Sequence, residues 1–270
     1  VLKQAGHTTS LIYLEREPER ETFLRELAGH APALVAFSST THQHPVVERC
    51  AGWIKEERPE VFVLSGGTHP TLAPDSVARC GALDAICVGE GEWATLELVQ
   101  RLEEGRPAAD VRNLWVRQEH GEWARNPARP LIEDLDALPF ADRELFDFSS
   151  ILARNAGWVD LMAGRGCPYR CSYCCNPGLQ ERYRGLGRYV RFRGVENLMR
   201  EIDELAERYP VRTLNFQDDT FTLNRKWTLA FCEAYAGRFD FPFWINTRVE
   251  RILDDQELVR ALARAGCRGV

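Results

Sequence analysis

The chain has 270 residues, of which 44% are hydrophobic and 27% are charged, and its formal net charge is −6. This composition is typical of a globular protein, and the acidic balance without a long Lys/Arg block argues against duplex nucleic acid as the main partner, because phosphate binding needs clustered positive charge. No apolar run approaches the roughly 18 residues of a membrane-spanning helix, so the sequence predicts a soluble, cytoplasmic protein without a membrane span. One local arginine cluster leaves RNA open as a substrate, although a solvated loop is the simpler interpretation: Arg182, Arg184, Arg188, Arg191 and Arg193.

Both ends of the sequence look cut. The chain begins at Val1, in what reads as the last turn of a helix ending at Gly6, and it stops at Val270 on the first residues of an expected strand. We therefore expect a piece of a longer protein.

The first part of the chain alternates short apolar runs with amphipathic stretches. Strands are expected over 10–14, 33–38, 61–65 and 84–88, and helices over 19–28, 46–57 and 93–104. Apolar runs rich in Val and Ile and separated by helices indicate a parallel sheet covered on both faces. Residues 1–107 therefore read as a doubly wound (Rossmann-like) α/β domain.

Residues 108–156 differ in character. A small hairpin is expected over 113–116 and 121–124, and the prolines that follow interrupt any longer element. We interpret this region as a linker with local structure.

Strand–helix alternation resumes at Trp158. Strands are expected over 158–162, 211–216 and 241–245, and helices over 195–209, 226–235 and 255–265. Three βα units and the start of a fourth, over residues 157–270, favour the N-terminal half of a (β/α) barrel, whose chemistry sits at the carboxyl ends of the strands.

The most informative motif is a loop directly after the strand at 158–162. It holds three cysteines with the spacing C-x3-C-x2-C, namely Cys167, Cys171 and Cys174. Thiolates are the usual ligands of iron–sulfur clusters. Three ligands on a four-iron cluster leave one iron open, which a catalytic metal centre requires.

Simpler interpretations of this loop fit less well. Structural zinc needs a fourth ligand, but all six histidines lie at or before His120, and Cys175 directly adjoins Cys174. A redox pair of Cys171 and Cys174 leaves Cys167 unexplained. The remaining cysteines fall on apolar faces and read as small hydrophobic residues: Cys50, Cys80, Cys87, Cys232 and Cys267.

The motif C-x3-C-x-aromatic-C after a first barrel strand, with Tyr173 as the aromatic residue, resembles the signature of radical S-adenosylmethionine (SAM) proteins. The resemblance implies a [4Fe–4S] cluster whose open iron binds SAM, and whose reduction cleaves SAM to a 5′-deoxyadenosyl radical. It also implies that Tyr173 lies by the adenine, and that an external electron donor of the flavodoxin or ferredoxin type serves the cluster.

Two further strand ends fit this resemblance. Asp218 and Asp219 follow the strand at 211–216, where the family contacts the amino end of SAM, although the usual motif there is Gly-Gly-Glu; a helix-capping turn before Asn224 is the alternative. Arg248 follows the next strand, where it is expected either to pair with the SAM carboxylate or to form a salt bridge with Glu250.

Small or Gly-rich loops follow three successive strands of the first domain, at 38–40, 66–70 and 89–92. They suggest a surface for a ligand, because ligands lie outside the carboxyl ends of strands in open α/β sheets. Plain tight turns are the alternative. In their order along the chain these segments resemble the cobalamin (B12)-binding domain that precedes the barrel in many radical SAM proteins. The resemblance implies cobalamin contacts from Ser38, Thr40, Gly66, Gly67, Gly89 and Glu90.

The family's cobalt-ligand motif, Asp-x-His-x-x-Gly, does not occur in the sequence, and a scaffold that has lost cobalamin is an alternative. His42, His44 and His69 lie on the ligand-side loops and are interpreted as loop residues rather than as metal ligands.

The sequence thus predicts a member of the cobalamin-binding domain radical SAM family. The expected reaction is methyl transfer to an unactivated carbon of a small-molecule or peptide substrate. A radical cyclisation or rearrangement without methyl transfer is the alternative enzyme, and a non-catalytic iron–sulfur electron carrier or zinc module is the alternative of another class.

Overall fold

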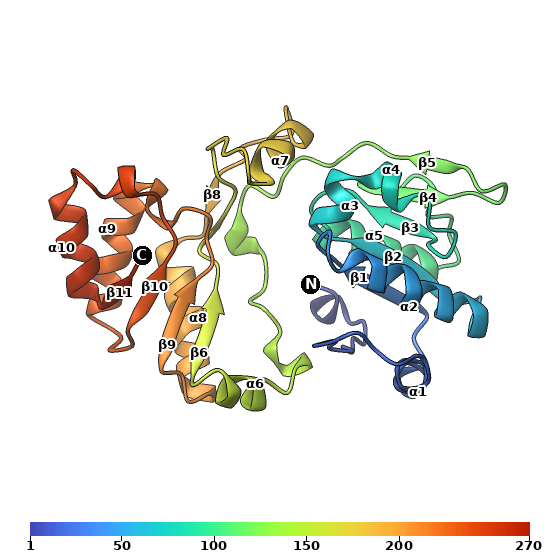
Figure 1. The fold of residues 1–270 in the computed structure, drawn as a ribbon, viewed down its shortest axis with the longest axis horizontal. Helices are drawn as coiled ribbons and strands as arrows, with labels where there is room; N and C mark the ends of the chain where they lie inside the picture. Colours follow the sequence, from blue (N-terminus) through green and yellow to red (C-terminus); the bar gives the residue numbers. More distant parts are fainter. The chain divides into compact units, whose positions relative to one another are not determined.

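The computed structural model describes all residues 1–270, and the chain folds into two compact units. Unit 1 comprises Val1–Ile132 and Pro177–Gly187, and unit 2 comprises Glu133–Asn176 and Arg188–Val270. Figure 1 shows the elements of each unit. The domain bounds expected from the sequence, 1–107, 108–156 and 157–270, stay a prediction.

Unit 1 is built on a five-stranded sheet with the order β1-β2-β3-β4-β5. Its strands are β1 (Leu34–Ser38), β2 (Phe62–Gly66), β3 (Ala85–Cys87), β4 (Leu114–Arg117) and β5 (Trp123–Arg125). Its helices are η1 (Lys3–Ala5), α1 (Arg20–His30), α2 (His44–Glu57), α3 (Thr68–Leu72), α4 (Pro74–Val77) and α5 (Glu92–Glu103), and α7 (Asn176–Arg182) joins it from Pro177 onward. β1, β2 and β3 are parallel, whereas the predicted hairpin forms β4 and β5 and continues the sheet in antiparallel fashion.

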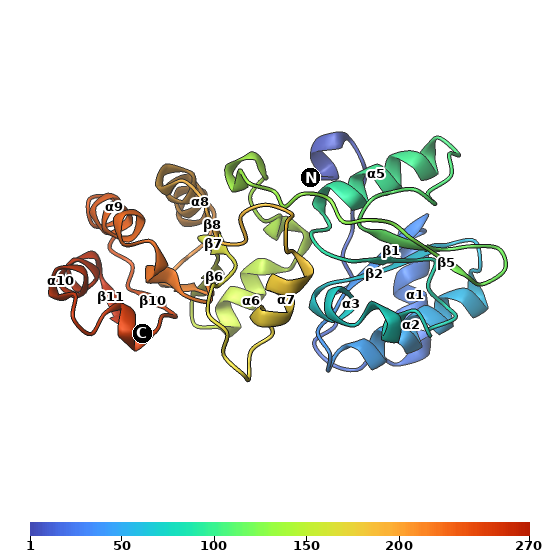
Figure 2. The same ribbon diagram turned by 90° about the horizontal axis from the view of Figure 1, so that it is seen from above.

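Alternation along the strands covers both faces of this sheet. Val63 and Ile86 belong to the core formed with α1 and α2, whereas Leu64 and Cys87 belong to the core formed with α5. Successive side chains of a strand point to opposite faces, so apolar runs without polar interruptions give a sheet buried on both sides. Figure 2 shows α5 on one face and α1 and α2 on the other, and the doubly wound α/β class is confirmed.

The strand expected over residues 10–14 does not form, and that prediction is wrong. Tyr13 and Leu14 are 54% and 38% exposed, and only Ile12 packs against the core. An apolar run needs a neighbouring strand with which to exchange hydrogen bonds, and the run itself does not specify one.

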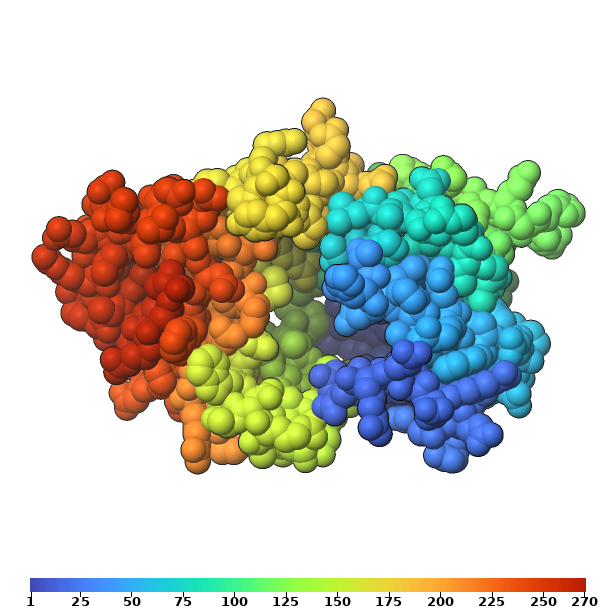
Figure 3. Space-filling model, viewed as in Figure 1, coloured from blue at the N-terminus to red at the C-terminus, as the bar shows by residue number.

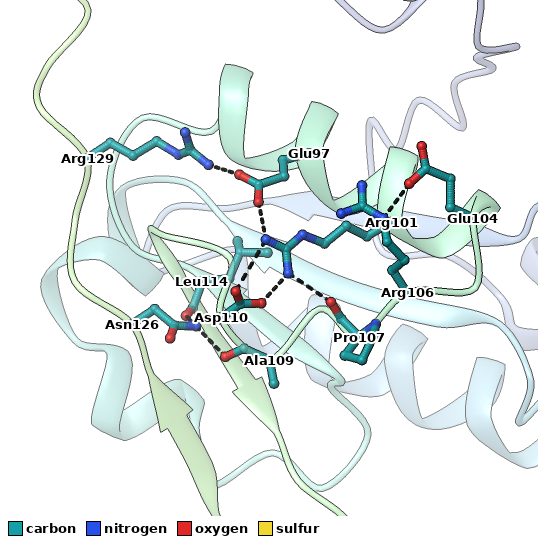
Figure 4. A network of polar contacts seen from close by, with 10 residues as sticks. All are labelled: Glu97, Arg101, Glu104, Arg106, Pro107, Ala109, Asp110, Leu114, Asn126 and Arg129. Carbon is teal, nitrogen blue, oxygen red and sulfur yellow. Dashed lines mark hydrogen bonds and ion pairs between the residues drawn. The ribbon is translucent and has the colours of Figure 1, made fainter.

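A polar network fastens α5 to the segments on either side of the hairpin (Figure 4). Arg101 forms ion pairs with Glu97 and Asp110 and donates from Nη1 to the carbonyl oxygen of Pro107 at 2.9 Å. Glu97 in turn pairs with Arg129. The network links the last helix of the doubly wound part to the chain before and after the hairpin.

Unit 2 is built on a four-stranded, fully parallel sheet with the order β11-β10-β9-β6. Its strands are β6 (Trp158–Leu161), β9 (Thr213–Phe216), β10 (Phe243–Ile245) and β11 (Cys267–Gly269), and a separate antiparallel pair consists of β7 (Gly164–Arg165) and β8 (Arg191–Phe192). Its helices are η2 (Leu135–Ala137), η3 (Arg143–Leu145), α6 (Phe148–Arg154), α8 (Val195–Arg208), η4 (Phe221–Leu223), α9 (Arg225–Ala236), η5 (Val249–Arg251) and α10 (Gln256–Ala265).

The four-stranded sheet carries its helices on one face. Phe216 and Phe243 are fully buried against α8, α9 and α10, and burial of such a side chain contributes about 1.5–3 kcal/mol. Trp158 and Trp244, about 40% exposed, belong to the opposite face, and their ring centroids lie 5.7 Å apart. Figure 2 shows α8, α9 and α10 together on one side of the strands, and α10, red in Figure 3, forms part of the outer surface.

The segment before β6 is fastened to α8 at two points. The Asp136 carboxylate accepts hydrogen bonds from the Gly194 nitrogen, at 2.9 Å and 3.1 Å, where α8 begins. Arg143 pairs with the buried Glu201 of α8 at 2.7 Å. From Glu133 onward, the segment before β6 is therefore part of unit 2. None of the chain's helices is long and apolar enough to span a membrane.

Candidate cofactor sites

The three cysteines of the motif lie on the loop that follows β6 and β7. Cys167 is buried, Cys171 and Cys174 are partly buried, and Cys175 is exposed. The loop begins at Gly166, whose φ is +86° and where a Cβ would lie 2.3 Å from the carbonyl oxygen of Tyr189. Only glycine suits that position, because it tolerates positive φ and lets another backbone approach closely.

Each of the three sulfurs has a polar neighbour. Cys167 Sγ lies 3.5 Å from Thr220 Oγ1, and Arg248 Nη1 donates to Cys171 Sγ at 3.2 Å. Cys174 Sγ accepts from the backbone nitrogen and from Nδ2 of Asn176, at 3.5 Å and 3.4 Å. The donors aimed at Cys171 and Cys174 stabilise a thiolate, which is the form that binds metal.

The pKa values distinguish Cys174 from the cysteines of the cores. Hydrogen bonds from the backbone and then the side chain of Asn176 lower the pKa of Cys174. Burial instead raises the pKa of Cys50 to about 11 and that of Cys87 and Cys232 to about 12, because it disfavours the charged thiolate.

The donor chemistry of the loop fits an iron–sulfur cluster. No three His, Cys, Asp or Glu side chains of the chain are grouped so that they could hold one metal ion. A four-iron cluster takes each thiolate on a different iron, so its ligands need not converge on one point. Three cysteines that lie on one loop without converging on one point, each with a polar group near its sulfur, are therefore compatible with such a cluster.

The two aspartates after β9 have different environments. Asp218 is 4% exposed and accepts a hydrogen bond from the Ala163 nitrogen at 2.9 Å, which fastens the turn between β6 and β7. Burial raises the pKa of Asp218 to about 6, although backbone donors oppose the shift. Asp219 is exposed. The capping interpretation is wrong, because Asn224 itself caps α9 by accepting from the Trp227 nitrogen at 3.1 Å.

Arg248 makes more contacts than the sequence suggests. The predicted ion pair with Glu250 is present at 2.8 Å, through Nη2. The same guanidinium contacts Cys171 and lies 4.3 Å from the centroid of the Tyr169 ring, while its buried Nε has no hydrogen-bond partner. Tyr173 is 91% exposed. The SAM contacts of both residues remain predictions.

In unit 1 the ends of β1 and β2 lie side by side, with Ser38 opposite Gly66. Gly67 has φ +101°, and a Cβ there would lie 2.7 Å from the Ser39 nitrogen, so only glycine suits this position. The hydroxyls of Ser39 and Ser65 are buried without a hydrogen-bond partner. Buried polar groups are normally paired, so two orphaned hydroxyls next to the predicted cobalamin loops fit a site for a polar ligand.

The other predicted cobalamin residues also lie in unit 1. The nitrogen and hydroxyl of Thr40 both donate to Gln43 Oε1, at 2.9 Å and 3.1 Å. Gly89 has φ +112° and donates from its nitrogen to Thr71 Oγ1 at 3.1 Å. Glu90 accepts from the Ile132 nitrogen at 2.8 Å, so its carboxylate is engaged within the unit.

Two of the three loop histidines are adjacent. The rings of His44 and His69 have centroids 4.7 Å apart, and His44 is 5% exposed. Burial, followed by the charge of His69, lowers the pKa of His44, which disfavours its protonated form. His69 Nδ1 lies 3.2 Å from Thr41 Oγ1.

Sequence reasoning missed three residues near the sulfurs. Asn176 and Tyr189 lie beyond the motif, and Thr220 follows the aspartate pair. The one available signal was the position of Asn176, two residues after the last cysteine of the motif. Nothing in the sequence indicates that Tyr189 contacts it.

Comparison with known proteins gives two family matches. Residues 1–99 match the B12 binding domain, and residues 161–270 match the Radical SAM superfamily. Together these domains imply cobalamin, SAM and a [4Fe–4S] cluster as cofactors.

Several curated proteins are similar over most of this chain. A methyltransferase of Pyrococcus horikoshii described as uncharacterized is 30% identical over 241 residues, which cover 88% of this chain and 50% of that protein. The anaerobic magnesium-protoporphyrin IX monomethyl ester cyclase of Rubrivivax gelatinosus is 28% identical over 273 residues, covering 97% and 48%. Hopanoid C-3 methylase of Methylococcus capsulatus is 24% identical, covering 98% and 49%. The chain thus spans about half the length of these relatives.

Solved structures share the fold. The radical SAM methyltransferase TsrM of Kitasatospora setae, with tryptophan and a SAM analogue bound, superposes with a TM-score of 0.74 at 20% identity, over 93% of this chain and 50% of that one. The cobalamin-dependent radical SAM enzyme OxsB gives a TM-score of 0.72 at 18% identity, over 92% and 36%. With a B12-binding domain followed by a radical SAM domain, the chain belongs to the cobalamin-binding domain radical SAM family.

Proposed function

We propose that the protein holds a [4Fe–4S] cluster on Cys167, Cys171 and Cys174, cleaves SAM reductively, and transfers a methyl group through cobalamin to an unactivated carbon. The observation that carries this proposal is the presence of a B12-binding domain and a radical SAM domain in one chain. The environment of the three sulfurs supports it, because each has a polar neighbour within 3.5 Å.

The bound cofactors would supply the electron for SAM cleavage and the methyl carrier, and the protein's own residues would hold and orient them. Asp219, exposed at the end of β9, would pair with the SAM amino group, and Tyr173 would lie by the adenine. Arg248 would pair with the SAM carboxylate while it contacts Cys171. Asp218 would act indirectly, because its carboxylate holds the turn at Ala163, shortly before the cysteine loop begins.

In unit 1 the glycines at 66, 67 and 89 would let cobalamin approach the backbone at the strand ends. Ser38 and Thr40 would offer hydroxyls, and Glu90 would hold the third loop through its bond to the Ile132 nitrogen. The buried hydroxyls of Ser39 and Ser65 support a polar ligand at this edge.

Radical cyclisation is the second candidate, and specific relatives favour it. Three anaerobic magnesium-protoporphyrin IX monomethyl ester cyclases are 28–29% identical over 97–98% of this chain. For either reaction we propose a small-molecule or peptide substrate and an external electron donor of the flavodoxin or ferredoxin type.

Electron paramagnetic resonance (EPR) tests the shared step. Protein reconstituted anaerobically with iron and sulfide, then reduced with dithionite, is expected to give a [4Fe–4S]+ signal that shifts when SAM is added. A cluster signal indifferent to SAM would indicate an electron carrier, and bound zinc in place of a cluster would contradict the proposal.

Mass spectrometry separates the two reactions. With SAM carrying a CD3 group, a methyltransferase gives a product that contains CD3, whereas a cyclase gives an unlabelled product that has lost hydrogen. Cobalamin omission is the control, because methyl transfer is expected to stop without it.

A further inference from the structure

We propose that Asn176 and Tyr189 form a positioning pair that directs N–H groups at the Cys174 sulfur and thereby raises the reduction potential of the cluster. The inference rests on the proposed function, because it requires a cluster on the cysteine loop. Neither residue belongs to the cysteine motif, and both lie in unit 2.

The first step is the orientation of the Asn176 amide. Asn176 is 3% exposed, and its Oδ1 accepts a hydrogen bond from the Tyr189 hydroxyl at 2.6 Å. The oxygen is therefore engaged, and Nδ2 faces Cys174 Sγ at 3.4 Å. A flipped amide would place its oxygen against the thiolate, which repels it, so the sulfur favours the orientation that donates to it, and the Tyr189 hydroxyl holds the amide there by donating to Oδ1.

The second step is the anchoring of Tyr189. β7 and β8 pair in antiparallel fashion, with Gly164 opposite Phe192 and Arg165 opposite Arg191. This pairing brings the carbonyl oxygen of Tyr189 so close to Gly166 that an added Cβ would lie 2.3 Å from it. The main chain of Tyr189 therefore adjoins the residue before Cys167, while its hydroxyl reaches the residue after Cys175. One residue ties the two ends of the cysteine loop together.

The third step is electrostatic. One electron from dithionite, which is itself oxidised to sulfite, converts [4Fe–4S]2+ to [4Fe–4S]+ without making or breaking a bond in the protein. The added negative charge is shared with the thiolate sulfurs, so N–H donors aimed at a sulfur stabilise the reduced state more than the oxidised one. Cys174 receives two such donors, one from the Asn176 backbone and one from its side chain.

The test is a redox titration of the reconstituted protein followed by EPR. Asn176→Ala removes the side-chain donor and keeps the backbone donor, and Tyr189→Phe removes only the hydroxyl that orients the amide. The free energy of a hydrogen bond to a charged group is large enough to change an equilibrium constant about tenfold. Only the difference in this hydrogen bond between the two oxidation states changes the potential, so at 59 mV per tenfold for one electron Asn176→Ala is expected to lower the potential by at most about 60 mV, and Tyr189→Phe by less in the same direction.

Tyr209→Phe is the matched control, because the Tyr209 ring packs edge-on against Phe148, with centroids 4.8 Å apart, away from the loop residues named above. Its potential is expected to equal that of the wild type. If Asn176→Ala takes up too little iron to titrate, Tyr189→Phe decides the question, since it keeps the size of the side chain.

Unchanged potentials in loaded variants would overturn the inference and leave the proposed function standing. Failure of the wild type to take up a cluster would overturn both. A lower potential in the Asn176 and Tyr189 variants, with the Tyr209 control unchanged, would support the positioning pair.

Discussion

At the scale of single residues, the cysteines of the loop differ in what surrounds them. Cys174 accepts two N–H groups, whereas the adjacent Cys175 is exposed. The two neighbouring thiols are thus distinguished by their contacts. The spacing of the motif also assigns Cys174, and not Cys175, as the cluster ligand.

This difference predicts unequal effects of two matched substitutions. Cys174→Ser is expected to lower the iron bound after anaerobic reconstitution by at least about tenfold, because it removes a ligand from the cluster. Cys175→Ser, one residue away, is expected to leave the iron content unchanged. Iron and sulfide analysis of both variants checks this, and equal losses would contradict the assignment of Cys174.

Asp218 predicts a dependence of stability on pH. Burial raises the pKa of this carboxyl to about 6. Below its ordinary range near 4 the group is protonated in both the folded and unfolded states, so folding incurs no charge penalty. As the pH rises through 6 the folded state must bury a charge, and the free energy of unfolding falls.

Asp218→Asn removes that titration. Between pH 5 and pH 8 the wild type is expected to lose about 1–2 kcal/mol relative to the variant, since one unit of pKa shift corresponds to about 1.4 kcal/mol. Urea denaturation at both pH values gives the change in the free energy of unfolding between pH 5 and pH 8 for each protein. Comparing the two changes removes any effect of the new amide that does not depend on pH. Parallel profiles would show that the carboxyl is not buried as described.

At the scale of elements, α8 is fastened by an ion-pair triad around one buried carboxylate. Glu201 is 4% exposed and pairs with Arg143 at 2.7 Å and with Arg193 at 2.5 Å. Arg143 comes from η3 and Arg193 follows β8, so one carboxylate joins three segments that are distant in the sequence. The burial of this carboxylate makes its partners necessary.

Removing the carboxylate is expected to be costly. Glu201→Ala leaves two partly buried arginines, 12% and 13% exposed, without their shared counterion, and is expected to lower the free energy of unfolding by about 2–4 kcal/mol. The exposed pair of Glu144 and Arg208 offers a comparison, and Glu144→Ala is expected to change stability little, because solvent screens such pairs. Denaturant unfolding of the two variants tests the contrast.

The elements also show which structures the hydrophobic pattern of the sequence predicts correctly and which it does not. The helix predicted over 195–209 is observed as Val195–Arg208, because apolar residues at helical spacing give one face that packs on the sheet. The run at 10–14 is equally apolar, yet it forms no strand, because a strand depends on a neighbour as well as on its own side chains. Helices are specified locally to a greater degree than edge strands.

At the scale of the whole molecule, each cofactor is proposed to bind residues of one unit. The cysteines of the motif belong to unit 2, and the predicted cobalamin residues belong to unit 1. This arrangement predicts that cobalamin uptake does not require the cluster.

A triple variant tests this independence. Protein with Cys167→Ala, Cys171→Ala and Cys174→Ala is expected to bind hydroxocobalamin with the affinity of the wild type, measured by absorbance after gel filtration, while it takes up no cluster. The complementary variant is Gly67→Ala, whose Cβ would collide with the Ser39 backbone. It is expected to lose cobalamin and keep the [4Fe–4S]+ signal, and loss of both cofactors together would contradict independent binding.

The sequence by itself determined the features that are local or periodic. The C-x3-C-x2-C spacing, the glycines after the strands and the alternation of strands and helices all lie within short stretches, and they sufficed for the α/β class and the family. Such signals can be read locally because period and spacing follow from the geometry of a single element.

Only the tertiary structure decided which residues meet. Tyr189 contacts Asn176 across 13 positions, Asp218 contacts Ala163 across 55, and Arg248 contacts Cys171 across 77. The spacing of residues along one element does not encode contacts over such separations, because they depend on how strands pair and where loops return. That is why the motif was evident from the sequence, whereas the groups that hold and polarise its sulfurs were not.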